Sequence, residues 1–120
     1  MAAELDAPLQ VNVAQRGTAV VVTLTGAADI EGATILRRRL LEAAPKATSL
    51  LVLDLGELSF ICSTGLGALI EANKICRAAG VRLRLIDPVP VIRKIIETTR
   101  LNKLIEVYDT LDEGLEPPAD

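Results

Sequence analysis

Histidine and tryptophan are absent from this sequence of 120 residues, which contains one phenylalanine and one tyrosine. Without histidine, the chain cannot form a Ser-His-Asp triad, a histidine-ligated metal site or an imidazole pH switch. Half of the residues are nevertheless hydrophobic, so the core must consist of leucine, isoleucine, valine and alanine. Folding buries roughly two-thirds of the surface of a chain of this length, which is enough for one domain without disulfides or metals.

The sequence also has few cysteines and a small net charge. Cys62 and Cys76 are too few for a disulfide scaffold, and no C-x-x-C pair indicates zinc binding or thiol exchange. If one helix carries both, they lie about 21 Å apart, beyond the reach of a disulfide. Free thiols are typical of a reducing compartment, and the N-terminus lacks the features of a signal peptide, so we expect a cytoplasmic protein. The net charge of −3 disfavours nucleic-acid binding, and no apolar run approaches the roughly 20 residues that span a membrane.

Apolar patterning predicts alternating strands and helices. We expect strands over residues 9–13, 19–24, 50–55, 81–86 and 104–108, and helices over 30–44, 63–79, a stretch that begins at Asp87-Pro88 and a short stretch that Asp109 caps. The first two strands form a hairpin, and the later strand–helix repeats require right-handed crossovers and parallel pairing. The sequence therefore predicts one α/β domain over residues 9–115, with a mixed, mainly parallel sheet of four to five strands packed with about four helices. Residues 1–8 are expected to be a disordered tail, and 116–120 a C-terminal tail.

The helices have recognisable ends and apolar faces. Gly26 is expected to end the second strand, and Asp29 is placed to cap the helix over 30–44. The residues expected to face the core are Ile30, Ala33, Leu36, Leu40, Leu41 and Ala44 in this helix, and Val91, Ile92, Ile95, Ile96 and Thr99 in the helix after Pro88. The basic run at 37–39 points in three directions around the helix, so we interpret it as solvated surface rather than an anion site.

The most informative stretch is 54–69, where a buried strand is expected to end, a short loop to follow and a helix to begin. In an open sheet of this kind, sites form where the chain leaves the carboxyl ends of parallel strands. Ser63 and Thr64 are natural N-cap residues, and the free amides and dipole of a helix N-terminus favour a phosphate. This junction is therefore the candidate functional site.

The helix after the junction has one weakly apolar face. Ser63 and Gly67 lie one turn apart on it, and Glu71 and Lys74 continue it. Glycine inside a helix costs about 1 kcal/mol relative to alanine, so Gly65 and Gly67 indicate that something approaches this helix closely. A purely structural interpretation is equally good at this point: a capping serine, with glycines that ease packing of the helix on the sheet.

Three other interpretations of the junction are weaker. Gly65-x-Gly67 is only a fragment of a dinucleotide-binding motif. Ser63 would need a base to act as a hydrolase nucleophile, and without histidine only a lysine or a carboxylate remains. Asp29 and Asp54 could bind a metal, yet each is better explained as a helix cap or a strand-end residue. We therefore expect no enzyme activity, no metal and no cofactor.

At this junction the sequence resembles the STAS domain, specifically the bacterial anti-sigma-factor antagonists. The residues that carry the resemblance are Leu53-Asp54-Leu55, Leu58-Ser59-Phe60, Ser63-Thr64-Gly65-Leu66-Gly67, and Gly26 with Asp29. The order of strands and helices matches over nearly the whole chain, from about residue 9 to 115. The resemblance implies that the α/β domain is a single STAS-like domain.

The resemblance also implies a partner-switching protein. In that family, an anti-sigma factor that is also a serine kinase binds the unphosphorylated antagonist, phosphorylation releases it, and a serine phosphatase reverses the modification. The matching acceptor is Ser63, with Thr64 as the second choice. The expected partner-binding residues are Asp29, Cys62, Ser63, Thr64, Gly65, Gly67, Glu71 and Lys74. Two alternatives stay open: a non-phosphorylated STAS docking subunit of a transport or signalling assembly, and a nucleotide-binding module.

The chain departs from the family pattern at two places. Cys62 stands where the family usually has an aspartate, and Ala27 and Ala28 stand where it favours an acidic and a larger apolar residue. We interpret Cys62 as a small residue tucked under the loop, because no resolving cysteine is in reach for a redox role. Cys76 lies on the apolar arc of its helix and is expected to be part of the core.

Overall fold

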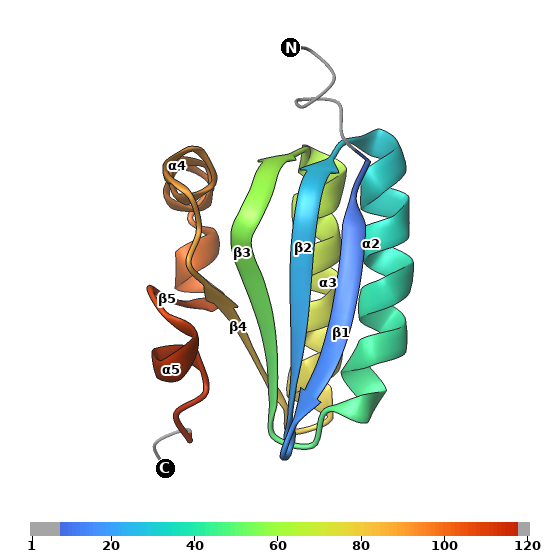
Figure 1. The fold of residues 1–120 in the computed structure, drawn as a ribbon, viewed down its shortest axis with the longest axis vertical. Coiled ribbons are helices and arrows are strands. Elements are labelled where there is room, and N and C mark those ends of the chain that lie inside the picture. Colours follow the sequence, from blue (N-terminus) through green and yellow to red (C-terminus); the bar gives the residue numbers. More distant parts are fainter. Residues whose placement is uncertain (1–7, 118–120) are drawn as a thin grey trace.

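The sheet is built from one hairpin followed by strand–helix–strand crossovers. The computed structural model describes residues 8–117 (Figure 1). Its elements are β1 (Gln10–Arg16), β2 (Ala19–Ala28), α2 (Ile30–Ala43), η1 (Ala44–Lys46), β3 (Leu50–Ile61), α3 (Ser63–Ala78), β4 (Arg82–Ile86), α4 (Pro90–Thr98), η2 (Leu101–Lys103), β5 (Glu106–Tyr108) and α5 (Leu111–Gly114). The strand order is β1-β2-β3-β4-β5, with β1 antiparallel to β2 and the other neighbours parallel. The predicted α/β architecture with a mixed, mainly parallel sheet is confirmed.

Alternating side chains give the sheet two apolar faces. In β2, Val22 and Leu24 belong to the large core that includes buried residues of α2, α3 and α4, whereas Val21 belongs to a smaller cluster that α5 helps to cover. Figure 1 looks onto the second face, with α2 and α3 behind the strands. Because β3 is covered on both faces, its first four residues are all buried, as expected for the apolar run that begins this strand.

The second strand does not end at Gly26. β2 continues to Ala28, and its register with β3 shifts between Gly26 and Ala27. Gly26 has a φ of +99°, which residues with a Cβ rarely adopt. The glycine therefore lets the strand pass an irregularity rather than stopping it.

Helix α2 begins where the sequence predicted. Asp29 is its N-cap, and the carboxylate Oδ1 accepts a hydrogen bond of 2.8 Å from the Gly32 amide. The expected core positions Ala33, Leu36 and Leu40 are buried. Ile30 was expected to be buried but is 77% exposed, because the first turn of the helix starts beyond the end of the sheet.

Two helix starts differ from those predicted. Asp87 does not cap α4: it has a φ of +54°, and the helix begins at Pro90 with Val89 as its N-cap. Val91 is consequently 54% exposed instead of buried, while Ile92 and Ile96 face the core as expected. The cap of α5 is Thr110 rather than Asp109, since its hydroxyl accepts from the amide of Glu113 at 3.2 Å.

Buried Arg84 ties the end of the domain to β4. Its Nη1 donates to the carbonyls of Gly114 and Glu116, and its Nε lies 3.0 Å from a carboxylate oxygen of Glu106. The guanidinium also sits 5.2 Å from the centre of the Tyr108 ring. The C-terminal segment is therefore held on the second face of the sheet.

The expected tails fall largely outside the described residues, since 1–7 and 118–120 are not placed. Pro8 forms a bridge with Ala27. Between residues 8 and 117, no group of three or more potential metal-ligating side chains gathers. No helix in that part of the chain is long and apolar enough to cross a membrane.

Candidate partner-binding site

The candidate site lies at the carboxyl edge of the parallel strands. β2 and β3 end at this edge, and α2 and α3 begin there (Figure 1). The loop expected after residue 55 does not exist: β3 continues to Ile61, and only Cys62 separates it from α3. Leu55, Leu58 and Ile61 are buried, and the pairing with β2 continues through register shifts. The start of α3 is therefore fixed directly to a core strand.

Cys62, rather than Ser63 or Thr64, is the N-cap of α3. Its amide donates to the carbonyl of Ala28 at 2.9 Å, and its carbonyl accepts from the amide of Leu66 at 3.0 Å. No side chain caps the helix. Ser63 and Thr64 occupy the first two helical positions, and both are exposed. Ser63 is thus exposed to solvent at a helix start that no side chain caps.

The two glycines of α3 have different environments. A Cβ on Gly65 would lie 2.7 Å from Cγ1 of Ile61 and 3.7 Å from the Cβ of Ala28, so the close approach there is internal packing. A Cβ on Gly67 would meet nothing within 4 Å. Gly65 is buried and does not belong to the accessible surface, whereas Gly67 leaves an open position one turn from Ser63.

Glu71 continues this face of α3 and is joined to α2. Its carboxylate accepts hydrogen bonds of 2.7 and 2.9 Å from Nε and Nη2 of Arg37. The hydrogen bond and charge of Arg37 lower the pKa of Glu71, and the same contact raises the pKa of Arg37. The sequence interpretation missed this partnership, because Arg37 seemed to belong to a solvated basic run. Lys74 is exposed on the next turn.

Asp29 lies beside the start of α3. In the pairing of β2 with β3, Ala28 stands opposite Ile61, so the residues that follow, Asp29 and Cys62, leave the sheet side by side. The exposed Asp29 side chain uses Oδ1 for the α2 cap. The structure therefore brings Asp29, which follows β2, next to Cys62, which follows β3. Gly65 was also expected to bind the partner, but it is buried beneath this surface.

The two thiols have distinct environments. Cys76 is 1% exposed in the core, as predicted, and burial raises the pKa of its thiol to about 11. Cys62 is half-buried at the N-cap position. Because no loop covers it, the expectation of a residue tucked under a loop is wrong.

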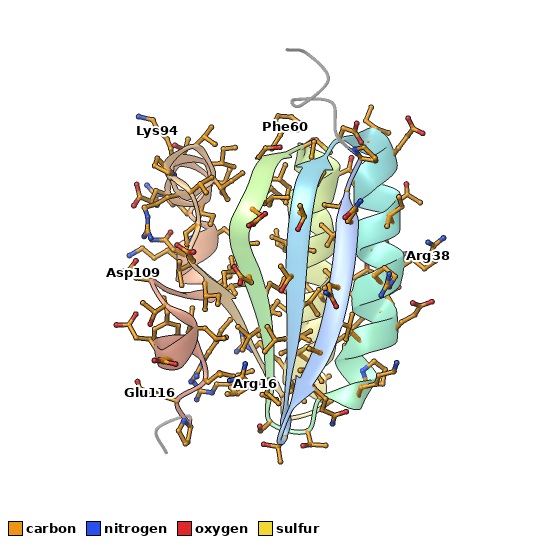
Figure 2. All side chains as sticks on the ribbon, in the orientation of Figure 1. Arg16, Arg38, Phe60, Lys94, Asp109 and Glu116 are labelled. Carbon is orange, nitrogen blue, oxygen red and sulfur yellow. The ribbon has the colours of Figure 1, made fainter. Side chains whose placement is uncertain are left out.

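Phe60 is an exposed aromatic side chain at this edge that the sequence interpretation did not assign to the site. It is 46% exposed, next to Leu58 and Ile61, which are buried. Figure 2 shows its ring at the upper end of β3. Two successive exposed residues, Ser59 and Phe60, interrupt the strict alternation of a strand. In the sequence, the adjacent apolar residues Phe60 and Ile61 point to opposite faces of a strand, and that is the signal from which an exposed Phe60 could have been found.

A family model of the STAS domain matches residues 10–114, and the chain belongs to the STAS domain family. A Mycobacterium tuberculosis protein, provisionally named an anti-anti-sigma factor, is 29% identical over 101 residues, which cover 82% of this chain and 68% of the relative. The crystal structure of an anti-sigma factor antagonist from Mycobacterium paratuberculosis is 26% identical, with a TM-score of 0.78 and coverage of 89% of this chain and 91% of that chain.

The same fold occurs in the anti-sigma factor antagonist SpoIIAA, at 24% identity. Its unphosphorylated form gives a TM-score of 0.71 over 88% of this chain and 90% of that chain. Its phosphorylated form gives a TM-score of 0.65 over 88% of this chain and 94% of that chain. The resemblance to the STAS domain is therefore confirmed in both sequence and fold.

Proposed function

We propose that this chain is an anti-sigma-factor antagonist that acts by partner switching. In its unmodified form it binds an anti-sigma factor that is also a serine kinase, and phosphorylation of Ser63 ends that binding. A serine phosphatase restores the unmodified form. In this scheme the chain is a regulator and not an enzyme, since the kinase and the phosphatase supply the chemistry.

The observation that carries the proposal is the position of the Ser63 hydroxyl. It is exposed at the first position of α3, one turn from the open position at Gly67. A kinase must enclose its acceptor hydroxyl closely, and the absence of a side chain at Gly67 leaves room for that approach. Membership of the STAS family and relatives named as antagonists support the same role.

The switch follows from charge and solvation. Phosphorylation adds between one and two negative charges and three strongly hydrated oxygens to Ser63. A partner surface fitted to a bare hydroxyl would have to remove water from that group, which is costly. The positive end of the α3 dipole tolerates the same charge, so the fold need not change. Phosphorylation therefore weakens the binding of the partner and leaves the fold of the domain unchanged.

The neighbouring residues give this hypothesis internal controls. Thr64 is exposed next to Ser63, so the variant Thr64→Ala tests whether the kinase modifies position 63 and not position 64. Ser59 lies four residues earlier in β3, and its Oγ is 3.1 Å from the carbonyl of Gly26, to which it donates. Ser59 is thus a serine near the same edge whose hydroxyl is already engaged.

The test is incubation of the protein with candidate anti-sigma kinases from the same genome and ATP, followed by mass spectrometry of the intact protein and its peptides. We expect one phosphate on wild type, Thr64→Ala and Ser59→Ala, and none on Ser63→Ala. Undiminished phosphate uptake by Ser63→Ala would contradict the assignment of the acceptor. A partner that binds tightly and transfers no phosphate would instead favour the role of a docking subunit.

A further inference from the structure

Exposed large hydrophobic side chains concentrate around Ser63. Five occur between residues 8 and 117: Ile30, Phe60, Ile75, Val91 and Leu104. Three of them stand at the carboxyl ends of neighbouring parallel strands. Ile30 follows β2, Phe60 lies in the last residues of β3, and Val91 is in the first turn of the helix that follows β4.

These three side chains follow the strand order β2-β3-β4, and we call them the apolar row. Phe60 is paired with Ala27 in β2, and neighbouring strands lie about 4.8 Å apart, so Ile30 begins its helix close to Phe60. On the other side, α4 packs into the core through Ile92 and Ile96, which leaves Val91 outward. Figure 1 places α4 beside the upper part of β3, at the level where α3 begins. Ile30 and Phe60 therefore lie close to the start of α3, where Ser63 is exposed, and Val91 is on the helix beside β3.

The remaining two exposed hydrophobic residues lie elsewhere. Ile75 is in the C-terminal half of α3, and Leu104 follows η2. Single exposed apolar residues are normal on protein surfaces, but several that follow neighbouring strands near one candidate site indicate an interaction surface. Aromatic residues such as Phe60 are enriched at the centre of protein interfaces.

Acidic groups border the row. Asp29, Glu31, Glu57 and Asp87 are exposed at or near the ends of the same strands. The exposed Lys94 on α4 is a basic residue that Figure 2 labels near this end. A second copy of the chain would bring its own acidic border against this one. The charges therefore favour a different partner, with basic groups around an apolar contact.

We propose that Ile30, Phe60 and Val91 are the apolar anchors of the docking surface around Ser63, and that its occupant is a protein with an apolar patch bordered by arginine or lysine. This inference rests on the proposed function, because it takes the occupant to be the anti-sigma factor. It also explains how a phosphate ends binding to a partner with a basic border. The phosphate lies within the apolar row, where it must lose its water, and not at the border where basic groups could pair with it.

The test is titration calorimetry with the purified anti-sigma factor that binds the wild-type chain. We expect Phe60→Ala to weaken binding by about tenfold or more, and Ile30→Ala and Val91→Ala by at least about threefold each. Ile75→Ala and Leu104→Ala are matched controls, since they remove the same kind of exposed side chain elsewhere, and should stay within about twofold of wild type. Equal effects at all five positions, or none at Phe60 and Ile30, would overturn the docking surface.

The charge of the occupant is tested separately. Glu31→Lys should weaken binding, whereas Glu42→Lys, on the same helix but away from the edge, should not. The affinity of wild type should fall as sodium chloride is raised from low to high concentration. An affinity that is independent of salt and of Glu31→Lys would show that the occupant lacks a basic border.

A photo-crosslinking residue at position 30 gives a second readout that does not depend on packing, because Ile30 is 77% exposed. It should crosslink to the anti-sigma factor, and the same residue at position 104 should not. If Ser63→Asp releases the partner while the three anchor variants bind normally, the proposed function stands and the docking surface is wrong. If Ser63→Asp binds as wild type does, the proposed switch itself fails.

Discussion

Arg37 and Glu71 join the two helices behind the sheet through paired hydrogen bonds of 2.7 and 2.9 Å between guanidinium and carboxylate. Arg37 is on α2 and Glu71 is on the face of α3 that carries Ser63 and Gly67. A bidentate contact restricts both side chains more than a single hydrogen bond does. The pair therefore fixes the surface of α3 one turn beyond Gly67 and two turns beyond Ser63.

We expect this pair to contribute little to stability and to depend on pH. Arg37 lowers the pKa of Glu71 below its ordinary value of 4.5. The contribution of the ion pair to stability is therefore complete above pH 4.5, and it is lost as the pH falls through the lowered pKa of Glu71. A double-mutant cycle with Arg37→Ala and Glu71→Gln, measured by urea unfolding, should show a small coupling at pH 7. The coupling should vanish at pH 2 and shrink in high salt, since both side chains are exposed. A coupling that is unchanged at pH 2 would rule out the ion pair as its source.

Gly65 and Gly67 allow a matched comparison within one helix. Alanine at Gly67 gains helix propensity in open space, so Gly67→Ala should raise the free energy of unfolding by about 0.5–1 kcal/mol. Alanine at Gly65 would press on Ile61 from 2.7 Å, so Gly65→Ala should be less stable than Gly67→Ala by about 1–3 kcal/mol. Denaturant unfolding of both variants checks this. Equal stabilities would mean that the junction of β3 and α3 is not tightly packed.

Cys62 leaves α3 without a side-chain cap, and aspartate there should supply one. The carboxylate of Cys62→Asp can accept from the free amides of the first turn and interact with the helix dipole. We expect it to exceed Cys62→Ala in free energy of unfolding by about 0.5–2 kcal/mol at pH 7. The difference should narrow as the carboxylate is protonated in acid. If the two variants are equally stable at pH 7, the start of α3 is not uncapped in solution.

Arg84 should be required to hold the C-terminal segment. Arg84→Met keeps much of the buried apolar stem but leaves the carbonyls of Gly114 and Glu116 without their donor. We expect a loss of about 2–4 kcal/mol in the free energy of unfolding. Arg84→Lys should not restore it fully, because a single ammonium cannot reproduce the planar set of donors. Chemical denaturation is the measurement, and a loss below about 0.5 kcal/mol, the range of ordinary surface substitutions, would contradict the account.

The features that were predictable from sequence depend on short stretches of chain. The cap at Asp29, the buried run that begins β3 and the core position of Cys76 each follow from a few neighbouring residues. The order of strands and helices then determined the topology, because right-handed crossovers leave few alternatives.

The features that were missed depend on residues far apart in the chain. Arg37 and Glu71 meet only once α2 and α3 are packed together. Gly65 differs from Gly67 because Ile61 lies against one of them and not the other. The length of β3 depends on irregular pairing with β2, which no period-two pattern reveals. At the start of α4, Pro90 disfavours the helical conformation for the residue before it, and Val89 is extended, so the helix begins at Pro90 and not at Pro88.

The central claim is that a phosphate on Ser63 ends binding to the anti-sigma factor. The most direct measurement is titration calorimetry of that partner with the unmodified chain and with the chain that carries phosphoserine at position 63 in full yield. Circular dichroism of both forms establishes that the fold is the same. We predict that the phosphorylated form binds about 100-fold more weakly or worse, a difference of about 2.7 kcal/mol. Equal affinity of the two folded forms would contradict the account.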